Sequence, residues 1–130
     1  MGKTGYFTHP DCRKHDMGAG HPECPERLDA IDDRLLITGV ADALDRREAT
    51  PAAMGELLLA HGRRHVAALR GLNDILAEEI DAGGPDRYSL DPDTSMNRFT
   101  YRAALLSAGA AIDAVDAVMT GELENAFCAT

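Results

Sequence analysis

The sequence predicts an α/β fold in which a few parallel strands lie against several helices. Residues 4–8 and 125–130 are short segments with the composition of strands, and several helical patterns separate them. Strands joined by long helical crossovers pair in parallel and carry helices on the faces of their sheet. The aromatic content is only 5%, with no tryptophan, which also favours closely packed helices over a β-sandwich.

The first part of the chain predicts a strand, a long loop and a helix. The sequence TGYFT at residues 4–8 is aromatic and typical of a strand. Histidine, proline and glycine dominate residues 9–24, and a loop of this length in a compact domain is usually functional or disordered. Pro25 suits the first turn of a helix that Gly39 ends. The apolar face of this helix consists of Leu28, Ile31 and Leu35.

The middle of the chain predicts a short strand and two helices. Residues 47–50, REAT, fit a second strand, and Pro51 then begins a short helix. A longer helix follows Gly62 and stops at residues 83–85, Gly-Gly-Pro. Its apolar stripe consists of Val66, Leu69, Leu72, Leu76 and Ile80.

The last part predicts a polar loop, a long helix and a terminal strand. The loop covers residues 85–97, and the helix of about 20 residues after it ends at Gly121. Residues 125–130 then form a buried strand that brings Thr130 to the carboxyl edge of the sheet, where ligand sites of α/β folds lie. The small residues expected to bring this helix close to its neighbours are Ala104, Ala108, Ala111 and Ala114.

Length and charge limit the class of protein. The 130 residues predict one domain over residues 1–130. The net charge of -9 opposes binding to a phosphate backbone, and the short basic pairs Arg46-Arg47 and Arg63-Arg64 are interpreted as solvated charge, so no nucleic-acid partner is expected. No apolar run approaches the roughly 20 residues of a membrane span, and no signal segment opens the chain. These features favour a cytoplasmic protein with reduced cysteines and no membrane partner.

One candidate metal site lies in the first loop. His9, Cys12 and His15 are spaced as H-x-x-C-x-x-H and offer ligands that zinc accepts, with His21 or Cys24 as a possible fourth. The alternative is that these histidines cap backbone groups or pack at the edge of the sheet. Structural zinc sites usually combine two close ligand pairs, and a second pair is missing here, so no metal is assigned.

Charged residues in two other places are candidates for a binding site. Asp91 and Asp93 lie in the second polar loop, where carboxylates commonly stabilise turns. Arg27 lies in the first turn of its helix, where a cation opposes the helix dipole. That conflict is explained if the guanidinium holds a buried anion, and the alternative is a surface pair with Glu23 or Glu26.

Three segments together resemble the N-terminal part of the zinc-dependent histone deacetylase family, near its bacterial class II-like members and the acetylpolyamine amidohydrolases. They are GHPECPERL at residues 20–28, ELLLAHGRRHVAALRGL at residues 56–72, and DTSMNRFTYRAALLSAGAAIDAVDAVMTGELENAFCAT at residues 93–130. The resemblance covers essentially the whole chain. It implies an arginase-like α/β fold and the removal of acetyl groups from acetyl-lysine or acetylated polyamines by a zinc ion.

The resemblance also implies residue roles. Asp93 matches the loop aspartate that accepts hydrogen bonds from substrate N–H groups, with Asp91 as the alternative if the register slips. Arg27 matches the arginine of the channel through which acetate leaves. The family's catalytic histidine pair and its zinc ligands follow the segment that resembles NAFCAT, where this sequence stops, so no catalytic or metal residue is assigned.

Two hypotheses about the chain follow from these observations. In the first, the chain is an incomplete deacetylase-like domain that is inactive alone and self-associates through an exposed sheet edge. In the second, it is a non-enzymatic α/β interaction module, with or without a structural zinc ion on the loop of His9, Cys12 and His15.

Overall fold

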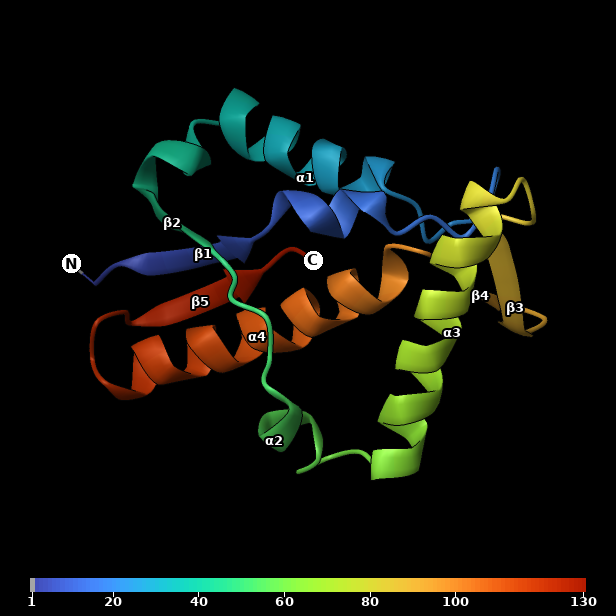
Figure 1. Ribbon diagram of the computed structural model, residues 1–130. Helices are drawn as coiled ribbons and strands as arrows, with labels where there is room; N and C mark the ends of the chain where they lie inside the picture. Colours follow the sequence, from blue (N-terminus) through green and yellow to red (C-terminus); the bar gives the residue numbers. More distant parts are fainter. Residues whose placement is uncertain (1) are drawn as a thin grey trace.

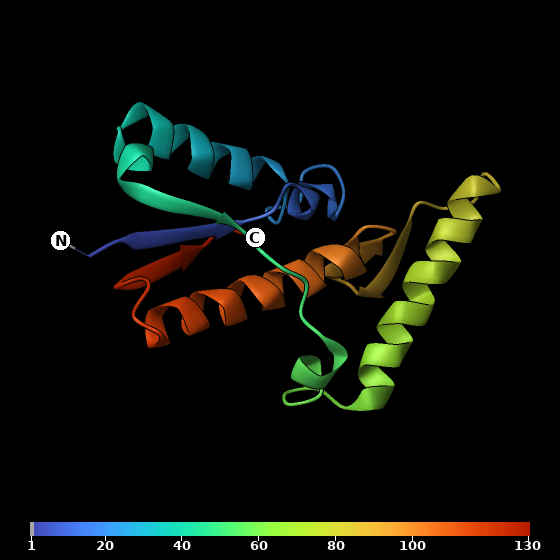
Figure 2. The same cartoon turned by 60° about the vertical axis from the view of Figure 1, so that its left-hand side comes forward.

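A three-stranded parallel sheet lies between two helices in the computed structural model, which describes residues 2–130 (Figure 1). The strand order is β2-β1-β5, so the first strand of the chain is central and the last is an edge. Helix α1 covers one face of the sheet and α4 covers the other, which both views show (Figures 1 and 2). The elements of this layer are β1 (Thr4–Thr8), α1 (Glu26–Ile37), β2 (Leu44–Glu48), α4 (Thr100–Met119) and β5 (Asn125–Cys128).

The central strand β1 supplies side chains to both faces of the sheet. Successive residues of a strand point to opposite faces, so Tyr6 and Phe7 enter different clusters. Phe7 packs with Ala110, Ala114 and Leu123 on the α4 side. Tyr6 packs with Leu28 and with Leu106 of α4 on the other side. Both aromatic side chains are almost completely buried.

Helix α1 forms where its sequence pattern predicts, and β2 is displaced. Leu28 is buried on α1, and Gly39 after the helix adopts a positive φ of 74° that glycine accepts without strain. A short 3-10 helix, η2 (Val40–Ala43), then leads into β2, which begins at Leu44 and not at Arg47 as predicted. Most side chains of β2 are charged, so the strand carries no apolar pattern from which its bounds are read.

Helix α4 packs very closely against the segment that follows β2. The N–H of Ala52 donates to the carbonyl oxygen of Leu105 over 2.9 Å, and a Cβ atom at Gly109 would overlap the carbonyl oxygen of Thr50. The predicted contact face was wrong in most of its members, because of the four alanines only Ala114 is buried. The buried residues are Ala103, Leu106, Gly109, Ala110, Ala114 and Ala117.

Two helices lie away from the sheet. The short α2 (Met54–Leu57) precedes α3 (Arg63–Asp81), which lies beside the N-terminal part of α4 (Figure 2). The predicted apolar stripe of α3 is confirmed, because each of its five residues is buried or half-buried. Among the described residues, every helix is too short or too polar to cross a membrane.

Residues 87–97 form an antiparallel β-hairpin where the sequence predicted a loop. Strands β3 (Arg87–Asp91) and β4 (Thr94–Asn97) pair through a turn at residues 91–94. In the hairpin only Met96 is fully buried, so the buried-and-exposed alternation that identifies a strand is missing. The hairpin contacts the first loop, where the N–H of Ser95 donates to the sulfur of Met17.

Candidate functional site

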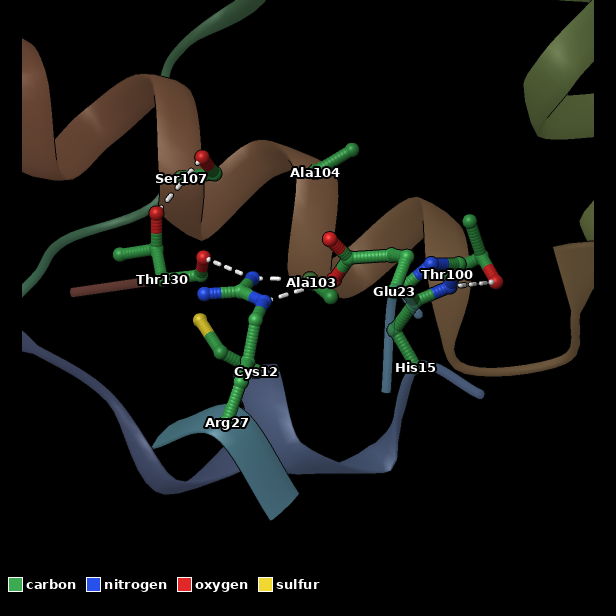
Figure 3. A pocket seen from close by; sticks show the side chains of 9 residues that line it. All are labelled: Cys12, His15, Glu23, Arg27, Thr100, Ala103, Ala104, Ser107 and Thr130. Carbon is green, nitrogen blue, oxygen red and sulfur yellow. Dashed lines mark hydrogen bonds and ion pairs between the residues drawn. The ribbon is translucent and has the colours of Figure 1, made fainter. Parts of the chain in front are cut away.

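Two cavities adjoin each other, and the first of them lies beyond the carboxyl ends of β1 and β5. The first, of about 290 Å³, is bounded by α4, the start of α1, the end of β5 and the 3-10 helix η1 (Pro10–Lys14) (Figure 3). This is the position where open α/β sheets bind ligands. The lining residues are Cys12, His15, Glu23, Arg27, Thr100, Ala103, Ala104, Ser107 and Thr130.

Arg27 connects the start of α1 to the end of β5. Its Nη2 donates to the carbonyl oxygen of Thr130 over 2.6 Å, and its Nε donates to Oε1 of Glu23 over 3.0 Å (Figure 3). The surface pair with Glu23 that the sequence suggested is therefore present, and the same guanidinium also lines a cavity. A cation at this place gives the cavity a positive centre, partly neutralised by Glu23.

Besides Arg27 and Glu23, the first cavity is lined by polar groups of His15, Thr100, Cys12, Ser107 and Thr130. Burial lowers the pKa of His15, whose Nδ1 lies 2.8 Å from Oγ1 of Thr100. Burial raises the pKa of Cys12, so its thiol keeps its proton. Ser107 and Thr130 share a hydrogen bond of 2.8 Å between their hydroxyl groups. Arg27 is thus the charged donor that a small anion in this cavity would meet.

The second cavity, of about 420 Å³, opens under the hairpin and shares four lining residues with the first. The shared residues are His15, Glu23, Thr100 and Ala104. Its walls are mostly apolar side chains of the first loop, α3, the hairpin and α4, among them Met17, Leu69, Leu90, Met96 and Tyr101. Asp93 and His21 also line it.

Asp93 lies in the turn at the tip of the hairpin, with 91% of its side chain exposed. Its Oδ1 is 3.0 Å from Nε2 of His21. Oδ2 accepts no hydrogen bond from a described residue. The neighbouring Asp91 differs, because its carboxylate accepts the N–H of Asp93 over 2.8 Å and stabilises the turn. Of the two aspartates, only Asp93 lines the cavity.

The candidate metal ligands of the first loop have other partners. Nδ1 of His9 accepts the N–H of Asp11 and so caps η1, while Cys12 is buried in the core and His15 bonds to Thr100. Residues 2–130 contain no group of three or more His, Cys, Asp or Glu side chains placed to hold a metal ion. The described residues therefore do not fit a zinc site.

Comparison with known proteins decides the family. Residues 21–130 match the model of the histone deacetylase domain. The chain belongs to the histone deacetylase family. It is 37% identical over 109 residues to a histone deacetylase-like amidohydrolase of Pseudomonas aeruginosa, and the match covers 84% of the chain and 26% of that protein. It is 36% identical over 128 residues to the human polyamine deacetylase HDAC10, covering 94% of the chain and 18% of that protein.

The fold of this deacetylase-family chain is also confirmed by a solved structure. The HDA15 HD domain superposes with a TM-score of 0.84 at 27% identity, over 98% of the chain and 34% of that structure. The chain therefore spans about a third or less of the length of each of these relatives. The predicted family and the partial α/β deacetylase fold are confirmed, and the roles of Asp93 and Arg27 stay predictions.

Sequence reasoning missed two features of this site. The apolar cavity depends on the hairpin, which was predicted as a loop. His21 was considered only as an optional zinc ligand, yet it contacts Asp93 from 72 residues away in the sequence. Nothing in the local pattern of GHPE indicates a partner so distant.

Proposed function

We propose that this chain forms the substrate-binding and product-binding sides of an active site that hydrolyses acetyl amides of lysine side chains or of small amines. The observation that supports this most directly is the pair of adjoining cavities. Asp93 stands at the rim of one, Arg27 lies in the other, and the cavities share a wall. A substrate that enters past Asp93 and an acetate ion that leaves past Arg27 would follow one path.

The two charged residues suit these roles chemically. An exposed carboxylate accepts N–H groups of a substrate, and such charge-assisted hydrogen bonds are stronger than neutral ones. Arg27 would attract acetate, which must compete with Glu23 for the guanidinium. The ion pair between Glu23 and Arg27 therefore weakens the binding of acetate to Arg27, and weak binding favours release of the acetate.

Binding and orientation are the contributions that we assign to this chain. Zinc, which the family resemblance implies, would supply polarisation of the amide carbonyl and an activated water. The described residues offer no ligand cluster for it. We therefore propose that the chain alone does not hydrolyse an acetyl amide, and purified residues 1–130 that turn over an acetyl-lysine peptide with added zinc would contradict this.

The activity itself is tested in a chimera. The aligned region of the Pseudomonas aeruginosa relative is replaced by this chain, and hydrolysis of an acetyl-lysine peptide and of an N-acetylated polyamine is measured. We expect an active chimera in which Asp93→Ala raises KM by about 10-fold or more, since a hydrogen bond to a charged group contributes about 1.5–3 kcal/mol. Asp74→Ala, at an exposed aspartate of α3 that lines neither cavity, is the control and changes KM by less than about 2-fold. An active chimera whose KM is insensitive to Asp93→Ala would refute the role of Asp93.

A further inference from the structure

We infer that His21 is a positioning residue that holds the Asp93 carboxylate ready for the substrate. This inference rests on the proposed function, because it requires Asp93 to be the group that receives substrate N–H groups. It gives the histidine of the HPE triplet, at the entrance to α1, a part in substrate binding.

Both ring nitrogens of His21 have partners, and together they define the tautomer. The N–H of Glu23 donates to Nδ1 over 3.0 Å. A neutral imidazole has one donor nitrogen and one acceptor nitrogen. Since Nδ1 accepts, the proton is on Nε2, which donates to Oδ1 of Asp93 over 3.0 Å. The main chain of the HPE triplet thus fixes the direction of the hydrogen bond to Asp93.

His21 is well suited to hold another side chain, and Asp93 needs such a partner. Pro22 restricts the backbone of His21 to extended conformations, and only 23% of the His21 side chain is exposed. Asp93, by contrast, is at the tip of a two-stranded hairpin, and such hairpins are marginally stable on their own. With 91% of its side chain exposed, Asp93 would sample several rotamers without the contact.

The contact with His21 also gives the two oxygens of the Asp93 carboxylate different roles. Oδ1 is taken by His21, whereas Oδ2 remains available to a substrate N–H at the mouth of the apolar cavity. A preorganised acceptor binds a ligand more tightly because the rotamer entropy is lost before binding. Loss of His21 should therefore raise KM and leave kcat nearly unchanged.

The environment of the ring is consistent with a persistent contact. The hydrogen bond and charge of Asp93 raise the pKa of His21. The hydrogen bond from Glu23 favours the neutral ring, because a protonated Nδ1 cannot accept it. The other titratable and charged groups around His21 are His15, Asp16, Glu23, Cys24, Glu26, Arg87 and Tyr101.

The test uses the chimera with the Pseudomonas aeruginosa relative and three histidine variants. His21→Ala should raise KM for an acetyl-lysine peptide about 5- to 10-fold with kcat within about 2-fold, the effect of losing one hydrogen bond. His21→Gln keeps an amide N–H at the place of Nε2 and should restore KM to within about 2-fold of the unsubstituted chimera. His61→Ala, an exposed histidine before α3, is the control and should change neither constant.

A second measurement uses the 130-residue chain itself. The pKa of His21, followed by NMR, should fall in the Asp93→Asn variant, because the raising carboxylate is gone. An unchanged pKa would show that the contact is absent in solution and would overturn the inference. This readout stands even if His21→Ala prevents folding of the chimera.

The outcomes separate the inference from the proposed function. If Asp93→Ala raises KM and both His21 variants leave it unchanged, the inference fails and the proposed function stands. If the variants His21→Ala and His21→Gln raise KM equally, the ring acts by packing and the inference also fails. If Asp93→Ala has no effect on KM in an active chimera, the proposed role of Asp93 is refuted, and the inference about His21 is refuted with it.

Discussion

Asp32 is the residue that joins most parts of the sheet layer. Its carboxylate accepts hydrogen bonds from the Tyr6 hydroxyl over 2.6 Å, from Nη2 of Arg13 over 2.8 Å and from Nη2 of Arg46 over 2.9 Å. The hydrogen bonds from Arg46, Tyr6 and Arg13 lower the pKa of Asp32 to about 2. Burial and the bond to Asp32 raise the pKa of Tyr6 to about 12. Arg46 is exposed, in agreement with its interpretation as solvated charge, and its ion pair with Asp32 also links β2 to α1.

The first prediction concerns Asp32→Asn, which should lower the free energy of unfolding at pH 7 by about 2 kcal/mol, the equivalent of the pKa shift. A carboxylate with a depressed folded-state pKa contributes stability that is complete above its unfolded-state pKa of 3.8 and is lost as the pH falls toward 2. The difference between variant and parent should therefore disappear between about pH 4 and pH 2. Urea unfolding across this range measures it.

Asp33→Asn is the matched control for this prediction. Asp33 is exposed on the same helix and forms no ion pair with a described residue, so its loss should change stability by less than about 0.5 kcal/mol at any pH. Equal effects of the two substitutions would show that α1 responds to its net charge and not to the hydrogen bonds of Asp32.

At the scale of elements, the amphipathic helices were predictable and the other elements less so. Polar residues lie opposite the apolar stripe of α3, so the sequence predicts which face of the helix is buried. The structure confirms this predicted face. Helix α4 is rich in alanine on all sides, so its orientation is set by tertiary contacts such as the one at Gly109. The charged β2 and the exposed hairpin bury few apolar side chains, so burial leaves no pattern in their sequences.

The second prediction compares two glycines inside helices. Gly109→Ala should destabilise the protein by about 1–3 kcal/mol or more, because the new methyl group overlaps the backbone of Thr50. Gly71→Ala in α3 meets no atom within 4 Å and should stabilise it by about 0.5–1 kcal/mol through helix propensity. Thermal unfolding of both variants gives the result, and stabilisation by Gly109→Ala would show that α4 and residues 49–52 are not in close contact.

At the scale of the whole molecule, the two edges of the sheet differ in chemistry. The edge strand β2 carries two acidic and two basic side chains, and charges of this kind protect an edge from pairing. The opposite edge, β5, has the uncharged sequence Asn-Ala-Phe-Cys and lies beside a groove of about 370 Å³. Val115 and Met119 of α4 line this groove and are 60% and 80% exposed.

The candidate site of the whole molecule was only partly predictable from the sequence. Asp93 and Arg27 were identified through their resemblance to family positions, and the structure places them in adjoining cavities. The cavities themselves, and the contact of His21 with Asp93, arise from segments far apart in the sequence that only the folded chain brings together. A local pattern records the chemistry of each residue, but it does not record these distances.

The asymmetry of the sheet leads to the last prediction, that the 130-residue chain self-associates through β5 and its groove. An unpaired strand without charges, next to exposed apolar side chains, gains both backbone hydrogen bonds and apolar burial when a second copy covers it. We expect the mass measured by light scattering to rise with concentration, and Met119→Lys to shift the equilibrium toward monomer by placing a charge in the groove. Leu59→Lys is the control, since Leu59 is 88% exposed but lies after α2, away from this edge, and should leave association unchanged. A parent chain that stays monomeric at every concentration, or that responds equally to both lysines, would show that the β5 edge does not drive association.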